Sequence, residues 1–258
     1  MRTFLNLLII LLIFSSCALE ENYQLPLLSE PSAMNVFCQV NSNESLRRVE
    51  YEYDMEKLIS ETTLVDGDIL YTTNFTYNNE AQLVYEIFES DYRKSEKTFI
   101  YNEMNQLVNI KFKFTDFDGN GNMVSEGVSE APREFEHNLL VKEWESWGGF
   151  STYEYTNGQL KTKIDYTKNA EKHHVTTYKF AKNLLIEEKK ETVNGGLIYF
   201  KTYKYDAQKR LIKIFDRENI IEENLYIDDK LIERKINYFG IDPGYYPCLG
   251  NFKYTFDY

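Results

Sequence analysis

The sequence predicts an all-β protein: a long antiparallel meander of repeated hairpins that forms a curved open sheet or a partial β-shell. The main observation is a repeat in which two aromatic residues, separated by one residue, precede a polar turn and a leucine. The clear copies are Tyr51 and Tyr53 with Leu58, Phe75 and Tyr77 with Leu83, Phe99 and Tyr101 with Leu107, Tyr153 and Tyr155 with Leu160, Tyr178 and Phe180 with Leu184, and Tyr203 and Tyr205 with Leu211. Internal repetition at a nearly constant spacing indicates a chain of similar supersecondary units.

Each unit is expected to contain two strands. Tyr203 and Tyr205 alternate with Lys204, which places the aromatic side chains on one face of a strand and the charge on the other. Residues that tolerate positive φ follow each aromatic pair and recur midway between pairs, as in Asn157-Gly158 and Asp66-Gly67.

Three degenerate units raise the count to nine; they lie at 117–123, 135–139 and 225–231. Two strands per unit give roughly sixteen to eighteen strands, and open sheets of more than about 10 strands tend to curl or split. This reasoning predicts the curved open sheet.

The domain organisation follows from the first residues. Arg2 precedes an apolar run from Phe4 to Phe14, which is shorter than the about 20 residues that a transmembrane helix needs. Ser15, Ser16 and Cys17 then resemble a bacterial lipobox, in which the cysteine becomes the lipidated first residue of the mature protein. We therefore expect a lipoprotein signal peptide at 1–16, a lipid-anchored tether at 17–45 and the β domain at 46–258. An ordinary secretory signal, with Cys17 incidental, is the alternative.

The same motif predicts an outer-membrane location, on the periplasmic or the cell-surface side. Ala18 stands where an aspartate is associated with inner-membrane retention. A transmembrane barrel is the competing interpretation. The face opposite the aromatic residues, however, carries charged side chains, for example Glu154 and Lys204. A charge that faces lipid is costly, so we expect the chain to be anchored to the membrane rather than to span it.

Cys38 and Cys248 are the cysteines that remain after lipidation. In an oxidising compartment they form a candidate disulfide; two free buried thiols are the alternative. No CxxC motif occurs in the sequence.

The formal net charge of −12 disfavours binding to nucleic acid and to anionic lipid headgroups. Between Ser151 and Asp216, however, Lys and Arg outnumber Asp and Glu. Lysines that protect strands from unwanted pairing explain this excess, and a polarised docking surface is the alternative.

A weak Ca²⁺ candidate lies at Asp116, Asp118 and Asn120, followed by Gly121. These residues match the first half of a calcium loop, but Gly127 occupies the position where a bidentate glutamate normally completes it. A hairpin turn explains the same residues, so no metal is expected.

Catalytic motifs are absent from the sequence: there is no Gly-x-Ser-x-Gly, no phosphate loop and no His-Glu-x-x-His. His173 and His174 are adjacent, so on a strand they point to opposite faces and cannot share one ion. We therefore expect a protein that is not an enzyme and carries no cofactor.

Trp144 and Trp147 are the candidate ligand contacts. Their odd spacing places them on opposite faces of a continuing strand, so we expect one to be buried and the other, near Gly148, to be exposed. An exposed tryptophan can stack on a sugar ring or on an apolar group of a partner.

The Tyr-x-Tyr-Asp pattern, and especially Phe117-Asp118-Gly119-Asn120-Gly121-Asn122-Met123, resembles the YD repeats of the RHS family. The resemblance covers about residues 51–231. It implies a spiralling β-shell, which in the large toxins of that family encloses a C-terminal effector. The short chain with its lipobox looks like the small YD-repeat lipoproteins of Bacteroidetes-type bacteria.

The expected function is a non-enzymatic, lipid-anchored module of the cell envelope that binds or supports an envelope protein. A glycan-binding accessory lipoprotein that uses an aromatic concave face is the alternative, and a hydrolase is a more distant one.

Overall fold

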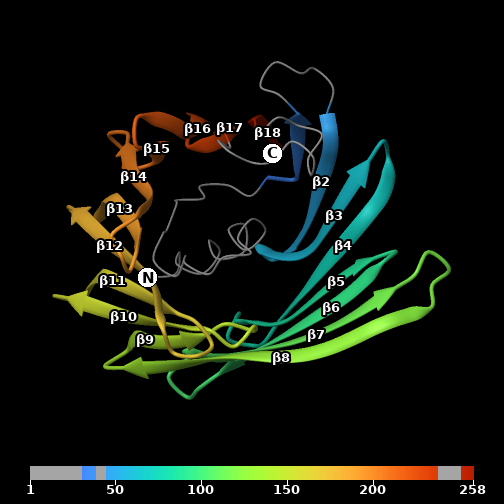
Figure 1. Ribbon diagram of the computed structural model, residues 1–258. Helices are drawn as coiled ribbons and strands as arrows, with labels where there is room; N and C mark the ends of the chain where they lie inside the picture. Colours follow the sequence, from blue (N-terminus) through green and yellow to red (C-terminus); the bar gives the residue numbers. More distant parts are fainter. Residues whose placement is uncertain (1–30, 39–44, 238–250) are drawn as a thin grey trace. The chain divides into compact units, whose positions relative to one another are not determined.

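The computed structural model describes residues 31–38, 45–237 and 251–258, and these form an all-β chain (Figure 1). Its strands are β1 Ala33–Cys38, β2 Ser45–Asp54, β3 Lys57–Val65, β4 Asp68–Tyr77, β5 Leu83–Ser90, β6 Arg93–Tyr101, β7 Leu107–Phe117, β8 Met123–Glu136, β9 Leu139–Trp144, β10 Phe150–Thr156, β11 Gln159–Tyr166, β12 Lys172–Ala181, β13 Leu184–Thr192, β14 Leu197–Tyr205, β15 Leu211–Asp216, β16 Asn219–Ile227, β17 Lys230–Asn237 and β18 Asn251–Asp257. In these ranges no helix is long and apolar enough to cross a membrane.

Several predictions fall outside the described residues. The signal peptide and Cys17 do so, as do Cys248 and the side chain of Cys38. Within the range expected to be a tether, however, Ala33–Cys38 forms strand β1.

The strands form one antiparallel meander of 18 strands, as the repeat predicts. The expectation of an open sheet or partial shell was wrong, because β1 pairs with both β2 and β18 and so closes the sheet, which has the connectivity of a β-barrel. β1 lacks the aromatic pair, and β18 has alternating aromatic residues but not the turn and leucine that complete the repeat, so the repeat pattern gives no sign of this pairing.

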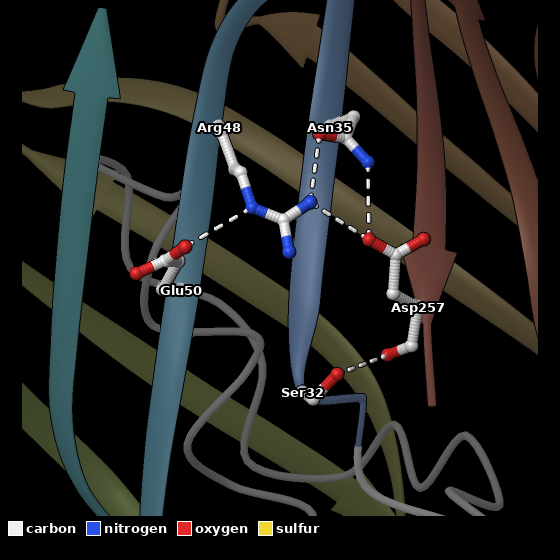
Figure 2. A network of polar contacts seen from close by, with 5 residues as sticks. All are labelled: Ser32, Asn35, Arg48, Glu50 and Asp257. Carbon is white, nitrogen blue, oxygen red and sulfur yellow. Dashed lines mark hydrogen bonds and ion pairs between the residues drawn. The ribbon is translucent and has the colours of Figure 1, made fainter. Parts of the chain in front are cut away.

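A polar network ties the three strands at the closure (Figure 2). Arg48 on β2 donates to the carboxylate of Asp257 on β18 at 2.8 Å and to the side-chain oxygen of Asn35 on β1 at 3.1 Å. Asn35 also donates to Asp257, at 3.3 Å, and Glu50 accepts from Arg48 at 3.1 Å. Exposed ion pairs are individually weak, but this network joins the first and last strands through side chains as well as through backbone pairing.

The chain divides into two compact units. One contains Met1–Phe75, Lys204–Ile214 and Ile220–Tyr258, and therefore the closure. The other contains Thr76–Tyr203 and Phe215–Asn219, and therefore β5 to β13 and nearly all of β14.

Most of the aromatic repeats share one hairpin geometry; Tyr203, the first aromatic of its unit, is an exception and is only half-buried. The first aromatic is buried, with no more than 9% of its surface exposed in Tyr51, Phe75, Phe99, Tyr153 and Tyr178. A β-bulge precedes the second aromatic, and that residue then lies directly opposite the leucine of the next strand. The pairs are Tyr53 with Leu58, Tyr101 with Leu107, Tyr155 with Leu160, Phe180 with Leu185 rather than the expected Leu184, and Tyr226 with Leu231.

The hydroxyl of the second tyrosine links one unit to the preceding one. Tyr101 donates to the carbonyl of Leu83 at 2.9 Å, and Tyr155 donates to the carbonyl of Leu140 at 2.9 Å. Tyr258 makes the equivalent bond to Leu231 at 2.8 Å. Each bond satisfies a backbone acceptor of the neighbouring unit, so the repeat residues hold the units together.

Candidate functional site

From β8 to β13, the two faces of the sheet carry different kinds of side chain. Strand register places Arg133, Glu143, Ser151, Lys163 and Asp165 on the face that carries Tyr153, here called the Tyr153 face. The opposite face carries Trp144, Phe150 and Tyr166 and is called the Phe150 face.

Asp165 is the centre of a polar cluster on the Tyr153 face. Its Oδ1 accepts from Ser151 Oγ at 3.0 Å and lies 3.6 Å from Lys163 Nζ. Its Oδ2 lies 2.9 Å from Lys190 Nζ and 3.8 Å from His174 Nδ1. The side chains come from β10, β11, β12 and β13, so one carboxylate joins four adjacent strands.

Glu143 extends this Asp165 cluster to β8 and β9. It accepts a hydrogen bond from the Tyr153 hydroxyl. It also lies 3.5 Å from Arg133 Nε and 3.9 Å from Lys163 Nζ. Only 4% of the Lys163 side chain is exposed, so this cation is buried between two carboxylates. A buried charge persists only when it is paired in this way.

The environments of the cluster displace several pKa values. Burial alone would raise the pKa of Asp165, but Lys163, Lys190 and the Ser151 hydroxyl together hold it below its ordinary value. Burial, and then the charge of Glu143, raise the pKa of Glu145. Burial, and then Lys190 and His173, lower the pKa of His174.

Two carboxyls with pKa values displaced in opposite directions are the pattern of an acid and base pair. Here both oxygens of Asp165 already face donors or cations of the protein. The arrangement therefore cross-links the strands. Both carboxylate oxygens of Asp165 are occupied by protein partners and so are not available to a substrate.

A second carboxylate on the same face has a similar role. Glu188 on β13 accepts hydrogen bonds from the hydroxyls of Tyr199 and Tyr203 on β14. Burial, and then Glu188, raise the pKa of Tyr199, so this hydroxyl remains a donor across the physiological range.

Sequence reasoning missed the Asp165 cluster. The alternation of Lys163 with Asp165 and of Glu143 with Glu145 was visible, but the residues that face them across the sheet depend on register, and register depends on the bulges.

The predicted ligand contacts Trp144 and Trp147 are both partly exposed, but in different settings. Trp144 faces Phe150, with ring centres 6.4 Å apart, and Phe150 stacks on Tyr166 at 4.5 Å. Lys142 Nζ lies 4.1 Å from the centre of the Trp144 ring and 4.5 Å from that of Phe150. This aromatic row crosses β9, β10 and β11 on the Phe150 face.

Trp147 lies in the turn between β9 and β10, and 63% of its surface is exposed. Its indole covers Gly149 so closely that a Cβ there would come within 1.9 Å of the ring. Gly149 itself is buried.

The weak Ca²⁺ candidates lie at the end of β7 and in the β7–β8 turn, and the carboxylate oxygens of Asp116 and Asp118 have protein partners. Asp118 Oδ1 accepts from the backbone N–H of Asn120 at 2.8 Å and of Asn122 at 2.9 Å. Asp116 lies 2.6 Å from Arg93 Nε and accepts from Ser125 at 2.7 Å. Among the described residues, no group of three or more His, Cys, Asp and Glu side chains has the arrangement of a metal site.

Several solved structures resemble this chain, among them two weak likenesses. A porin-like protein from Bacteroides uniformis ATCC 8492 matches with a TM-score of 0.40 and 13% identity, over 67% of this chain and 93% of that one. The TcdB2-TccC3 structure matches with a TM-score of 0.29 and 12% identity, over 75% of this chain and 12% of that one. No family model and no curated protein matches.

Proposed function

We propose that this chain is a non-enzymatic, lipid-anchored lipoprotein of the outer membrane, and that its β domain is a binding or structural module of the cell envelope. The observation that carries the proposal is the structural use of the repeat residues. The first aromatic is buried and the second bonds to the preceding unit, which is what a stacked scaffold requires.

The signal-like run and Cys17 support the envelope location. The YD-repeat resemblance supports the same assignment, since it is carried by the hairpin residues that the structure uses. The Asp165 cluster supports a role without catalysis, because its charges are committed to one another.

Replacement of Cys17 tests the anchor. Cys17→Ser is expected to abolish incorporation of a fatty-acid label and to release the protein from the membrane fraction. Unchanged labelling and partitioning would contradict lipidation at this residue.

Glycan binding is the second candidate function, and the aromatic row favours it. Trp144, Phe150 and Tyr166 present neighbouring rings beside the ammonium of Lys142, and aromatic faces of this kind stack on sugars. Binding to immobilised envelope polysaccharide should then be lost in Trp144→Ala. It should persist in a matched Tyr92→Ala variant, since Tyr92 is 65% exposed and lies outside the row.

A further inference from the structure

Strand β8 is much longer than β9, the strand that pairs with one of its edges. It contains 14 residues, whereas β9 contains 6 and pairs only with the segment from Arg133 to Glu136. Strand β7 pairs with the remainder, from Met123 to Pro132, on the other side. In the described part of the chain, the segment from Met123 to Pro132 therefore has one edge without a strand partner.

Such an edge presents a row of backbone donors and acceptors. In an antiparallel pair, alternate residues direct their N–H and C=O groups away from the partner strand. Over this segment the row extends about 30 Å at about 3.4 Å per residue, which is long enough for a complete added strand.

The side chains along the edge alternate strictly. Val124, Glu126, Val128 and Glu130 are exposed and share the Phe150 face, with 68% of Val124 and 79% of Val128 accessible. The opposite side carries only small residues between the turn and Pro132, namely Ser125, Gly127, Ser129 and Ala131. On this side the ring of Phe114 lies over Gly127.

We propose that this edge binds an extended segment of a partner protein in which apolar residues alternate with Lys or Arg. The added strand would bond to the free edge of β8, place its apolar side chains beside Val124 and Val128, and pair its cations with Glu126. Glu130 already accepts from Asn109 at 2.8 Å and lies 3.5 Å from Lys111, both on β7. Opposite charges on facing strand positions stabilise such a pair and like charges destabilise it. The inference rests on the binding role proposed above and names its partner class.

The same charges disfavour a second copy as the occupant. Two antiparallel β8 edges that meet at Val128 would place Glu126 opposite Glu130 of the second copy. A net charge of −12 on each chain adds to this repulsion. A partner with basic residues removes both costs.

The test uses the full chain purified in detergent and a fluorescent nine-residue peptide of alternating valine and lysine. We expect saturable binding by anisotropy, lost when alternate peptide amides are N-methylated, because these cannot join the ladder. The charge-reversed variant Glu126→Lys should bind the Val-Lys peptide at least about tenfold more weakly and should gain binding to a Val-Glu peptide. The matched control is Glu80→Lys, which makes the same change in net charge at another exposed position and should bind like the parent.

Equal binding of the methylated peptide, equal weakening in the control variant, or no saturable binding would each overturn the proposal. So would a dimer of the free protein in light scattering whose stability changes on charge reversal, since a second copy would then occupy the edge. None of these results depends on the membrane partitioning of Cys17→Ser, so failure here and failure of the proposed anchor are separable.

Discussion

At the scale of single residues, the two aromatics of each unit have different physical roles. Phe99 is buried, whereas Thr98 beside it on β6 is exposed. The alternation of the sequence predicted that both aromatics of a pair would share the buried face, but in most units only the first is buried, and the second is half-buried. It did not predict the hydroxyl bonds of the second aromatic, because the bulge before that residue redirects its side chain.

Phe99→Ala is expected to lower the free energy of unfolding by about 3–5 kcal/mol, since it removes a large buried side chain and leaves a cavity. Thr98→Ala should change it by less than about 0.5 kcal/mol. Urea denaturation followed by circular dichroism measures both. Similar stabilities for the two variants would show that the Phe99 side of β6 is not core.

Tyr155→Phe isolates the bond between units. Loss of the hydroxyl leaves the Leu140 carbonyl without this donor, and we expect a loss of about 1 kcal/mol in the free energy of unfolding. Tyr92→Phe is the control, because Tyr92 is 65% exposed. A loss no greater than that of the control would mean that the repeated hydroxyl bond does not stabilise the sheet.

His174 should make stability depend on pH. Its pKa is lowered by burial, Lys190 and His173, and Asp165 raises it only in part. The unfolded chain therefore binds more protons between the two pKa values. The contribution of His174 to stability is complete above about pH 6.5 and is lost as the pH falls through its lower folded pKa.

We predict that His174→Gln flattens the decline in unfolding free energy between about pH 7 and 5, whereas His137→Gln, in the β8–β9 turn, leaves it unchanged. The raised pKa of Glu145 makes stability fall as the pH rises, which opposes the effect of His174. The parent and both variants share this contribution, so it cancels in the comparison. Parallel curves for parent and His174→Gln would contradict the assignment.

At the scale of elements, the hairpins were predictable and their internal geometry was not. Turn residues such as Asn157-Gly158 and Asp66-Gly67 were recognisable from their tolerance of positive φ, and all four adopt it. Other turns use Met55 and Glu56, or Lys182 and Asn183, with positive φ. Composition gives little sign of these turns, because the flanking ladders impose the conformation.

Gly127 on β8 tests the packing of the long hairpin. A Cβ at this position would lie 2.4 Å from Phe114 Cε1, so the ring must move away from its place beside Arg93, 5.5 Å from the ring centre. Gly127→Ala should therefore destabilise the protein by about 1 kcal/mol. Gly119→Ala in the adjoining turn has nothing within 4 Å of its Cβ and should melt like the parent. Equal melting temperatures would show that Phe114 does not cover Gly127.

At the scale of the whole molecule, repetition was sufficient to predict an all-β meander of roughly sixteen to eighteen strands. It was not sufficient to predict closure, which depends on the pairing of β1 with β18, two strands that lack the repeat. The sequence also gave no sign of the free edge of β8, because that edge follows from the unequal lengths of β8 and β9. Relations between distant or unequal strands are global properties that no local pattern encodes.

The β domain is closed at its ends through β1, and we propose that it is open to a partner along β8. Native-state hydrogen exchange, resolved by peptide, tests both parts in one measurement. Strands β2 and β18 are expected to exchange slowly along both edges, because β1 lies between them, while about half the amides from Met123 to Pro132 exchange fast. Fast exchange in β2 and β18, together with full protection of Met123 to Pro132, would contradict the account.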